Sequence, residues 1–87
     1  MRVFMVERSL GGISMDGLTG AQKAAISTAA AMRGEGTDIR YIRSTFLPED
    51  GRCICLFEAE TETDVGRLND TAGIPYDRLV AALDLAP

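Results

Sequence analysis

The side chains in this sequence with the greatest chemical reactivity belong to two cysteines that stand two residues apart. Cys53 and Cys55 stand in an apolar run that predicts a strand, where side chains two residues apart share a face. A pair of thiols on one face can bind a soft metal ion or act as a redox-sensitive dithiol. A second interpretation stays open, because free cysteine is among the most buried residue types and packs as a small hydrophobe.

Two glutamates stand at the ends of similar apolar runs. Glu7 and Glu58 approach each other if their strands are neighbours, and two carboxylates in one cavity can ligate a metal ion. One of them can also act as a general base, with a pKa raised by burial. The alternative is that each glutamate pairs with an arginine, for which Arg8, Arg40 and Arg43 are available.

Tyr41 and Arg43 supply the remaining candidates. Regular alternation puts both side chains on one face of the strand predicted at residues 38–46. There they can form a pocket wall and a clamp for an anion. They are equally typical of an aromatic residue with a charged rim at a dimer interface.

Six elements must position these side chains. Apolar spacing and turn residues predict strands at residues 2–9, 38–46, 52–59 and 77–85, a helix at 16–33 and a second helix between Thr61 and Gly73. Asp16 or Thr19 is expected to cap the first helix and Thr61 the second. Residues 77–85 fit neither period well, and the architecture favours a strand there over a helix.

The element order is β-α-β-β-α-β, which predicts an α+β fold of the ferredoxin-like kind in one domain, residues 1–87. Two helices then cover one face of a four-stranded antiparallel sheet. The first and third predicted strands are apolar on both faces, so the open face also needs cover. We therefore predict a homodimer through the open face, which would enclose a cavity where a ligand could sit.

Composition excludes several classes of partner and site. The 87 residues carry a net charge of −4 and no cluster of basic residues, which argues against nucleic acid and anionic membranes. No run approaches the length of a membrane span, and the N-terminus lacks the apolar region of a signal peptide. We expect a cytoplasmic protein with reduced thiols. The absence of histidine excludes Ser-His and Cys-His nucleophile pairs.

Four stretches carry a resemblance to a known family: residues 4–8, 36–45, 55–59 and 72–77. In their order and spacing they resemble the small actinobacterial nickel-binding-protein-like family, a domain formerly of unknown function. The resemblance implies a ferredoxin-like homodimer that binds nickel. Tyr41 stands where the family usually has tryptophan and keeps an aromatic wall. Because nickel favours imidazole and thiolate and this chain has no histidine, a metal site here must use cysteines and carboxylates.

We therefore expect a small binding protein rather than an enzyme, with nickel or another divalent transition metal held by Cys53, Cys55, Glu7 and Glu58. On a regular strand Cys55 and Glu58 point to opposite faces, so one four-ligand site would need a bulge or a partner subunit. The alternative is a dimeric α/β-barrel-type enzyme or carrier for a small organic ligand in the sheet-face cavity. In that case Glu7 is the base, and Tyr41 and Arg43 orient the substrate.

Overall fold

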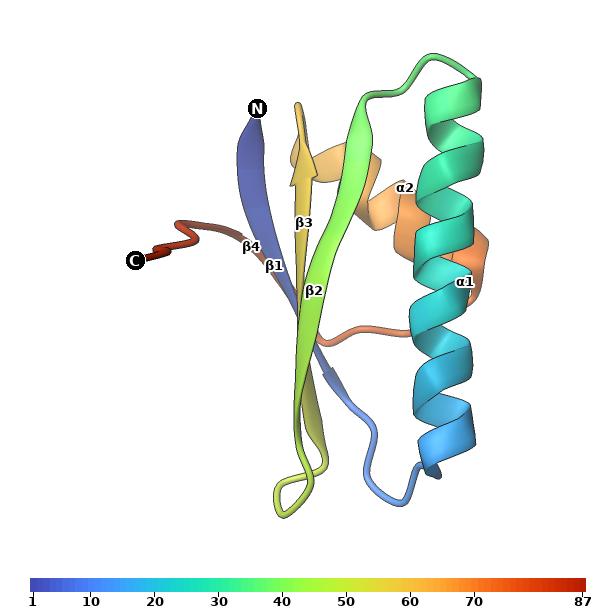
Figure 1. The fold of residues 1–87 in the computed structure, drawn as a ribbon, viewed down its shortest axis with the longest axis vertical. Helices are drawn as coiled ribbons and strands as arrows, with labels where there is room; N and C mark the ends of the chain where they lie inside the picture. Colours follow the sequence, from blue (N-terminus) through green and yellow to red (C-terminus); the bar gives the residue numbers. More distant parts are fainter.

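The computed structural model describes residues 1–87 and contains six secondary-structure elements (Figure 1). In chain order they are β1 (Arg2–Ser9), α1 (Met15–Gly34), β2 (Ile39–Leu47), β3 (Arg52–Ala59), α2 (Glu62–Ala72) and β4 (Arg78–Ala82). The predicted element order is confirmed. The last segment forms a strand despite its ambiguous sequence, because pairing with β1 satisfies the backbone hydrogen-bonding groups on one of its edges.

The four strands form one antiparallel sheet in the order β2-β3-β1-β4. The central strands are β1 and β3, in a register that sets Phe4 opposite Phe57 and Val6 opposite Cys55. This is the ferredoxin-like arrangement that the sequence predicts. It also makes neighbours of the two strands that carry the candidate glutamates and thiols.

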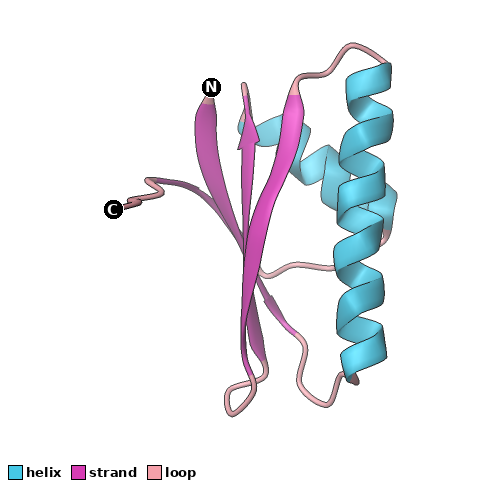
Figure 2. Cartoon of the chain, in the orientation of Figure 1, coloured by secondary structure: helices cyan, strands magenta, loops and turns pink.

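Both helices pack against the same face of the sheet and leave the other face uncovered (Figure 2). The core lies between these two layers, where every second residue of β1 and β3 is buried. Each large apolar side chain that is fully buried stabilises the fold by about 1.5–3 kcal/mol. The largest of them are Phe4, Phe57, Ile39, Leu68, Val6 and Val65.

The two helix starts differ in how well the sequence predicts them. Thr61 caps α2 as expected, and its hydroxyl accepts a hydrogen bond from the backbone N–H of Asp64 at 3.2 Å. The expectation that Asp16 or Thr19 caps α1 is wrong. The cap is Ser14, whose hydroxyl accepts from the N–H of Gly17 at 3.0 Å. Gly17 and Gly20, in the first two turns, weaken the helix propensity but do not stop the helix once this cap and the packing below hold it.

A β-bulge interrupts β2 and changes which side chains share a face. Tyr41 pairs with Phe57, but the next pairing joins Arg43 to Leu56, so Ile42 is left as the extra residue. The regular alternation predicted for this strand is therefore wrong beyond Tyr41. Because a bulge shifts the side-chain phase by one residue, Ser44 turns toward the helices and Arg43 toward the open face.

The turn between β2 and β3 packs tightly against the loop after β1. Gly51 has φ +66°, and its carbonyl oxygen accepts from the N–H of Leu10. A Cβ on Gly51 would lie 2.7 Å from the Cα of Gly11. Glycine is required here both for the left-handed backbone and for the close approach of the two loops.

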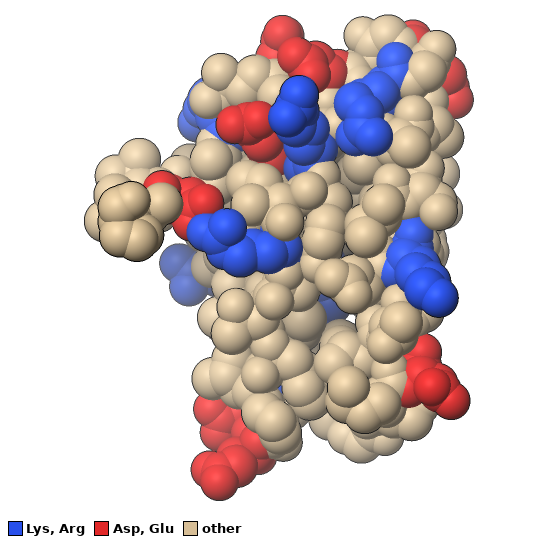
Figure 3. All heavy atoms as spheres, in the orientation of Figure 1, with Lys and Arg blue, Asp and Glu red and all other residues tan.

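The open face of the sheet is partly apolar and carries charges of both signs. Its half-buried apolar side chains are Val3, Met5, Ile54, Leu56 and Val80. Acidic and basic side chains are interspersed over the molecular surface seen in Figure 3.

Neither helix has the length and apolar character that crossing a membrane requires.

Candidate functional site

The two cysteines of β3 lie together on the helix side of the sheet. Cys53 and Cys55 are 2% and 6% exposed, and their Sγ atoms are 3.8 Å apart. Both are free thiols. The strand alternation that predicted a shared face for them is confirmed, and the face they share is the covered one.

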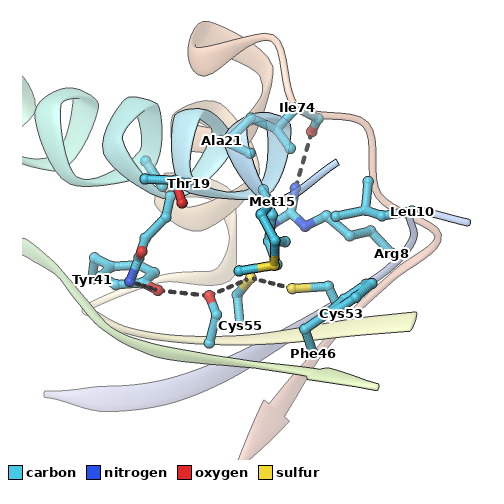
Figure 4. A pocket seen from close by; sticks show the side chains of 14 residues that line it. Arg8, Leu10, Met15, Thr19, Ala21, Tyr41, Phe46, Cys53, Cys55 and Ile74 are labelled. Carbon is cyan, nitrogen blue, oxygen red and sulfur yellow. Dashed lines mark hydrogen bonds between the residues drawn. The ribbon is translucent and has the colours of Figure 1, made fainter. Parts of the chain in front are cut away.

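A cavity of about 170 Å³ opens beside the thiols, between the first half of α1 and strands β2 and β3 (Figure 4). Met15, Thr19 and Gln22 are exposed residues of α1 at its mouth. Most of the lining is apolar, but the floor is not. The fourteen lining residues are Arg8, Leu10, Met15, Leu18, Thr19, Ala21, Gln22, Ala25, Tyr41, Ser44, Phe46, Cys53, Cys55 and Ile74.

A chain of hydrogen bonds crosses the cavity from α1 to the thiols (Figure 4). Gln22 Nε2 donates to Tyr41 Oη at 3.2 Å, Tyr41 Oη and Ser44 Oγ are 2.6 Å apart, and Ser44 Oγ donates to Cys55 Sγ at 3.0 Å. Since a serine hydroxyl has one proton and Ser44 gives it to sulfur, Tyr41 must be the donor to Ser44. Every donor in the chain therefore points toward the sulfur of Cys55.

Arg8 closes the inner end of the cavity with a buried positive charge. Its side chain is 2% exposed and continues the buried face of β1 after Phe4 and Val6. Its Nη2 donates to Asn69 Oδ1 at 2.7 Å, and its Nη1 donates to the carbonyl oxygens of Ile74 and Pro75, each at 3.3 Å. These acceptors lie at the C-terminal end of α2, where the helix dipole favours a cation.

Two features of Arg8 are unusual for a buried guanidinium. The ion pairs of the structure involve Arg43, Arg52 and Arg67, so Arg8 has no carboxylate partner. Its Nε is buried and has no hydrogen-bond partner. A buried donor left unpaired costs about 1–3 kcal/mol, so Arg8 carries an unsatisfied donor within the protein interior.

Burial controls the protonation of the inner thiol. Loss of hydration, together with the neighbouring Cys55, raises the pKa of Cys53 to about 11. The charge of Arg8 acts in the opposite direction but does not compensate for the burial. Cys53 is therefore a protonated thiol at neutral pH unless a bound ion displaces its proton.

Glu7 and Glu58 lie on the opposite, open face of the sheet. Glu7 Oε2 pairs with Arg52 Nη2 at 2.7 Å, and Arg52 Nε donates to the same oxygen at 3.2 Å. The predicted ion pair of Glu7 is thus present, but the partner is Arg52 rather than any of the three arginines expected. This bond raises the pKa of the Arg52 guanidinium. Glu58 takes part in no ion pair; its neighbours across the sheet are Val3 and Arg40.

The prediction that Tyr41 and Arg43 share a face is wrong. The bulge at Ile42 leaves the Tyr41 ring edge-on to Phe57 inside the cavity, with 5.7 Å between ring centroids. Arg43 points to the open face and pairs with Asp84. Tyr41 can form the expected pocket wall, but Arg43 cannot act as an anion clamp in that pocket.

The structure therefore separates the predicted metal ligands into two groups. Cys53 and Cys55 line the cavity under α1, while Glu7 and Glu58 lie on the other side of the sheet. No group of three or more histidine, cysteine, aspartate or glutamate side chains is close enough to hold one ion. Within one subunit, a metal site can use the two thiols but not the two carboxylates with them.

Three polar cavity residues that take part in the hydrogen bonds described above were not singled out as site residues from the sequence: Arg8, Ser44 and Gln22. The alternation of β1 contains the signal for Arg8, because it occupies a buried-face position after Phe4 and Val6. Ser44 could not be found in this way, since its orientation depends on the bulge. Gln22 could be identified as a cavity residue only from the position of α1 over β2.

The fold and the cavity define a small α+β protein of the ferredoxin-like kind with a buried dithiol beside a buried arginine. The family model described as "Nickel responsive protein SCO4226-like" matches residues 4–81, so this chain belongs to the SCO4226-like family. The crystal structure of SCO4226 from Streptomyces coelicolor A3(2) superposes with a TM-score of 0.77. It is 24% identical in sequence, and the match covers 97% of this chain and 99% of that one. None of the curated proteins compared with the chain matches it.

Proposed function

We propose that this protein is a small metal-binding protein that holds a divalent transition metal, such as nickel, through the thiolates of Cys53 and Cys55. The observation that carries this proposal is the 3.8 Å separation of the two sulfurs at the edge of a cavity. Two metal–thiolate bonds of about 2.3 Å that meet at a tetrahedral angle place their sulfurs about 3.8 Å apart. The dithiol can thus chelate an ion without rearranging β3.

The neighbouring groups support a thiolate site in two ways. The donor chain through Tyr41 and Ser44 ends on Cys55 Sγ, and a metal-bound thiolate readily accepts such a hydrogen bond. The charge of Arg8 partly balances the two negative sulfurs. Oxygen atoms of Ser44 or Tyr41, or water entering the cavity, can complete the coordination. The description of the family as nickel responsive supports nickel as the ion.

The experiment is a titration of the reduced protein with Ni²⁺. Binding is monitored by the absorption band that arises from charge transfer from thiolate to nickel. We expect near-stoichiometric binding that is lost in the Cys53→Ser, Cys55→Ser double variant. Because both thiols must lose their protons, affinity should increase with pH. The matched control is Glu7→Gln with Glu58→Gln, which removes the carboxylates of the open face and should leave binding unchanged. Absence of the band in the parent protein would refute the proposal.

We further propose that the open face joins two copies of this chain into a homodimer. Its half-buried apolar side chains form a row along β1, β3 and β4. Glu7 and Glu58 stand on that face among several arginines, so a two-fold related copy can complement both signs of charge. Sedimentation equilibrium should give a dimer for the parent and a folded monomer for Leu56→Asp. A parent that remains monomeric at high concentration would exclude this interface.

A cytoplasmic location and a binding rather than catalytic role are parts of the same proposal. Free thiols persist in a reducing compartment, which favours the cytoplasm.

A further inference from the structure

The cavity beside the two thiols is larger and more apolar than a bare metal ion needs. Its volume is about 170 Å³, close to that of engineered apolar cavities of about 150 Å³ that bind benzene. Most of its lining is hydrophobic, and α1 contributes Leu18, Ala21 and Ala25. An ion held by Cys53 and Cys55 would leave much of this apolar surface uncovered. The lining therefore fits a ligand that joins a thiol-binding atom to a compact apolar group.

The thiols are also suited to a ligand whose binding consumes protonated sulfur. Burial raises the pKa of Cys53 to about 11, so this thiol holds its proton at neutral pH. Trivalent arsenic is a soft centre that prefers thiolate ligands, and a monosubstituted arsenical, R–As(OH)₂, combines with two thiols without any change of oxidation state. Two As–S bonds form, two As–O bonds break, and each thiol proton leaves with a hydroxide as water. The product has no net charge, so an apolar cavity can hold it without the cost of burying an ion.

We propose that the cavity is a binding site for a monosubstituted trivalent arsenical, with arsenic bonded to the sulfurs of Cys53 and Cys55 and its organic group in the apolar space under α1. The two sulfurs are 3.8 Å apart, and a small rotation of either side chain lets one arsenic atom bridge them. Ser44 donates to Cys55 Sγ, and a sulfur bonded to arsenic keeps the lone pairs that accept this hydrogen bond. The ligand enters at the mouth, beside Met15 and Gln22.

This inference rests on the dithiol of the proposed function but not on its affinity for a divalent ion. Nickel and the arsenical would compete for the same two sulfurs, yet only the arsenical uses the apolar space beside them. Bridging of the thiols and accommodation of the organic group are therefore separable by experiment.

The first experiment adds phenylarsine oxide, the dehydrated form of phenylarsonous acid, to the reduced, metal-free protein and detects the adduct by native mass spectrometry. We expect one phenylarsenic group per chain, the loss of two thiol hydrogens, and an adduct that persists in excess glutathione. A bridged arsenic resists a monothiol because its second As–S bond closes within one molecule. Cys53→Ser and Cys55→Ser should each give an adduct that glutathione removes. No adduct in the parent, or one that glutathione removes as readily, would overturn the proposal.

The second experiment tests the apolar space by comparing phenylarsine oxide with methylarsine oxide. Both compounds form the same two As–S bonds and differ in the size of the group that enters the cavity. Affinities are measured by competition with dimercaptopropanol, a small dithiol that offers no cavity. Relative to this competitor, we expect the protein to favour the phenyl compound by about tenfold or more, because the ring buries more apolar surface. Absence of this preference would overturn the assignment of the cavity.

A cavity-filling variant tests the same point from α1. Ala21→Leu places three more carbon atoms against the space that the ring would occupy, and leucine is a good helix former. We expect the preference for the phenyl compound to fall about tenfold, while the methyl compound still bridges the thiols. Ala31→Leu, at an exposed position of the same helix, is the matched control and should keep the preference of the parent. An unchanged preference in Ala21→Leu would place the organic group outside the cavity.

The two proposals fail in different ways. A protein that gives the charge-transfer band with Ni²⁺ but shows no preference for the phenyl compound keeps the metal site and loses the arsenical site. A protein that shows this preference but gives no band has the arsenical site alone. Ala21→Leu should leave the titration with Ni²⁺ unchanged, since the ion uses the thiols and not the apolar space.

Discussion

Tyr41 and Arg43 are separated by one residue in the sequence, yet their side chains lie on opposite faces of the sheet. The bulge at Ile42 is the cause, because it pairs Tyr41 with Phe57 and Arg43 with Leu56. Tyr41 consequently joins the hydrogen-bond chain to the thiols, while Arg43 pairs with Asp84 on the other side. A single extra residue in β2 thus decides which polar groups enter the cavity.

Substitutions at these two positions should therefore have different effects. Tyr41→Phe removes the hydroxyl that contacts both Ser44 and Gln22, and we expect it to lower the free energy of unfolding by about 1 kcal/mol. Arg43→Ala removes a half-exposed ion pair and should change it by less than about 0.5 kcal/mol. Urea unfolding at one fixed protein concentration measures both. Similar losses for the two variants would contradict the separation of the faces.

The protonation of Cys53 predicts a loss of stability in alkali. A thiol is neutral when protonated, and its pKa rises from 9.0 to about 11 on folding. The unfolded chain therefore ionises first as the pH rises, and the free energy of unfolding falls between these two values. Below pH 9 both states hold the proton, and this group contributes no pH dependence. The total decrease is about 3 kcal/mol.

The measurement is urea unfolding in the presence of a reductant at intervals from pH 7.5 to 10. Cys53→Ala should lack the component that appears above pH 9, whatever its own stability at neutral pH. If the parent and this variant have parallel profiles, the folded-state pKa of Cys53 is not raised.

The contact between the β2–β3 turn and the loop after β1 predicts a difference between two glycines. In Gly51→Ala, the new Cβ would both meet the Gly11 backbone at 2.7 Å and occupy a left-handed conformation. We expect a loss of about 2–4 kcal/mol in the free energy of unfolding. Gly12 has φ +80° but open space around it, so Gly12→Ala should cost about 1–2 kcal/mol. Thermal or urea unfolding of the pair tests this order, and equal losses would argue against the steric contact.

Arg8 is expected to hold the end of α2 against β1. Arg8→Met leaves Asn69 Oδ1 and the carbonyl of Ile74 without their donor, which should cost about 2–5 kcal/mol. Amide hydrogen exchange should show the greatest loss of protection at the C-terminal turn of α2 and in residues 73–76. Arg40→Met, on an exposed position of β2, should change neither quantity appreciably. A loss of protection spread evenly over the sheet would assign Arg8 a different role.

Local rules in the sequence were sufficient to predict the order of the elements, the bounds of β1 and β3, the cap at Thr61 and the shared face of the two cysteines. Each of these depends on residues close together in the chain: alternation of apolar residues, a hydroxyl before a helix, or a fixed spacing of two on a strand. The resemblance to a family also came from short ordered stretches, and the match to residues 4–81 confirms it.

The tertiary structure alone decided the composition of the site. Nothing near Ile42 in the sequence indicates that this residue is an extra, unpaired one in the strand. The orientation of Ser44 and Arg43 therefore depended on pairing with β3. The cavity arises where α1 stands off from the sheet, and the burial of Arg8 follows from the packing of α2 over β1. These are relationships between different elements, with a separation of 11 residues for Ser44 and Cys55 and of 61 residues for Arg8 and Asn69. Side-chain periodicity cannot predict them, because it gives the direction of side chains within one element and not the position of that element relative to the others.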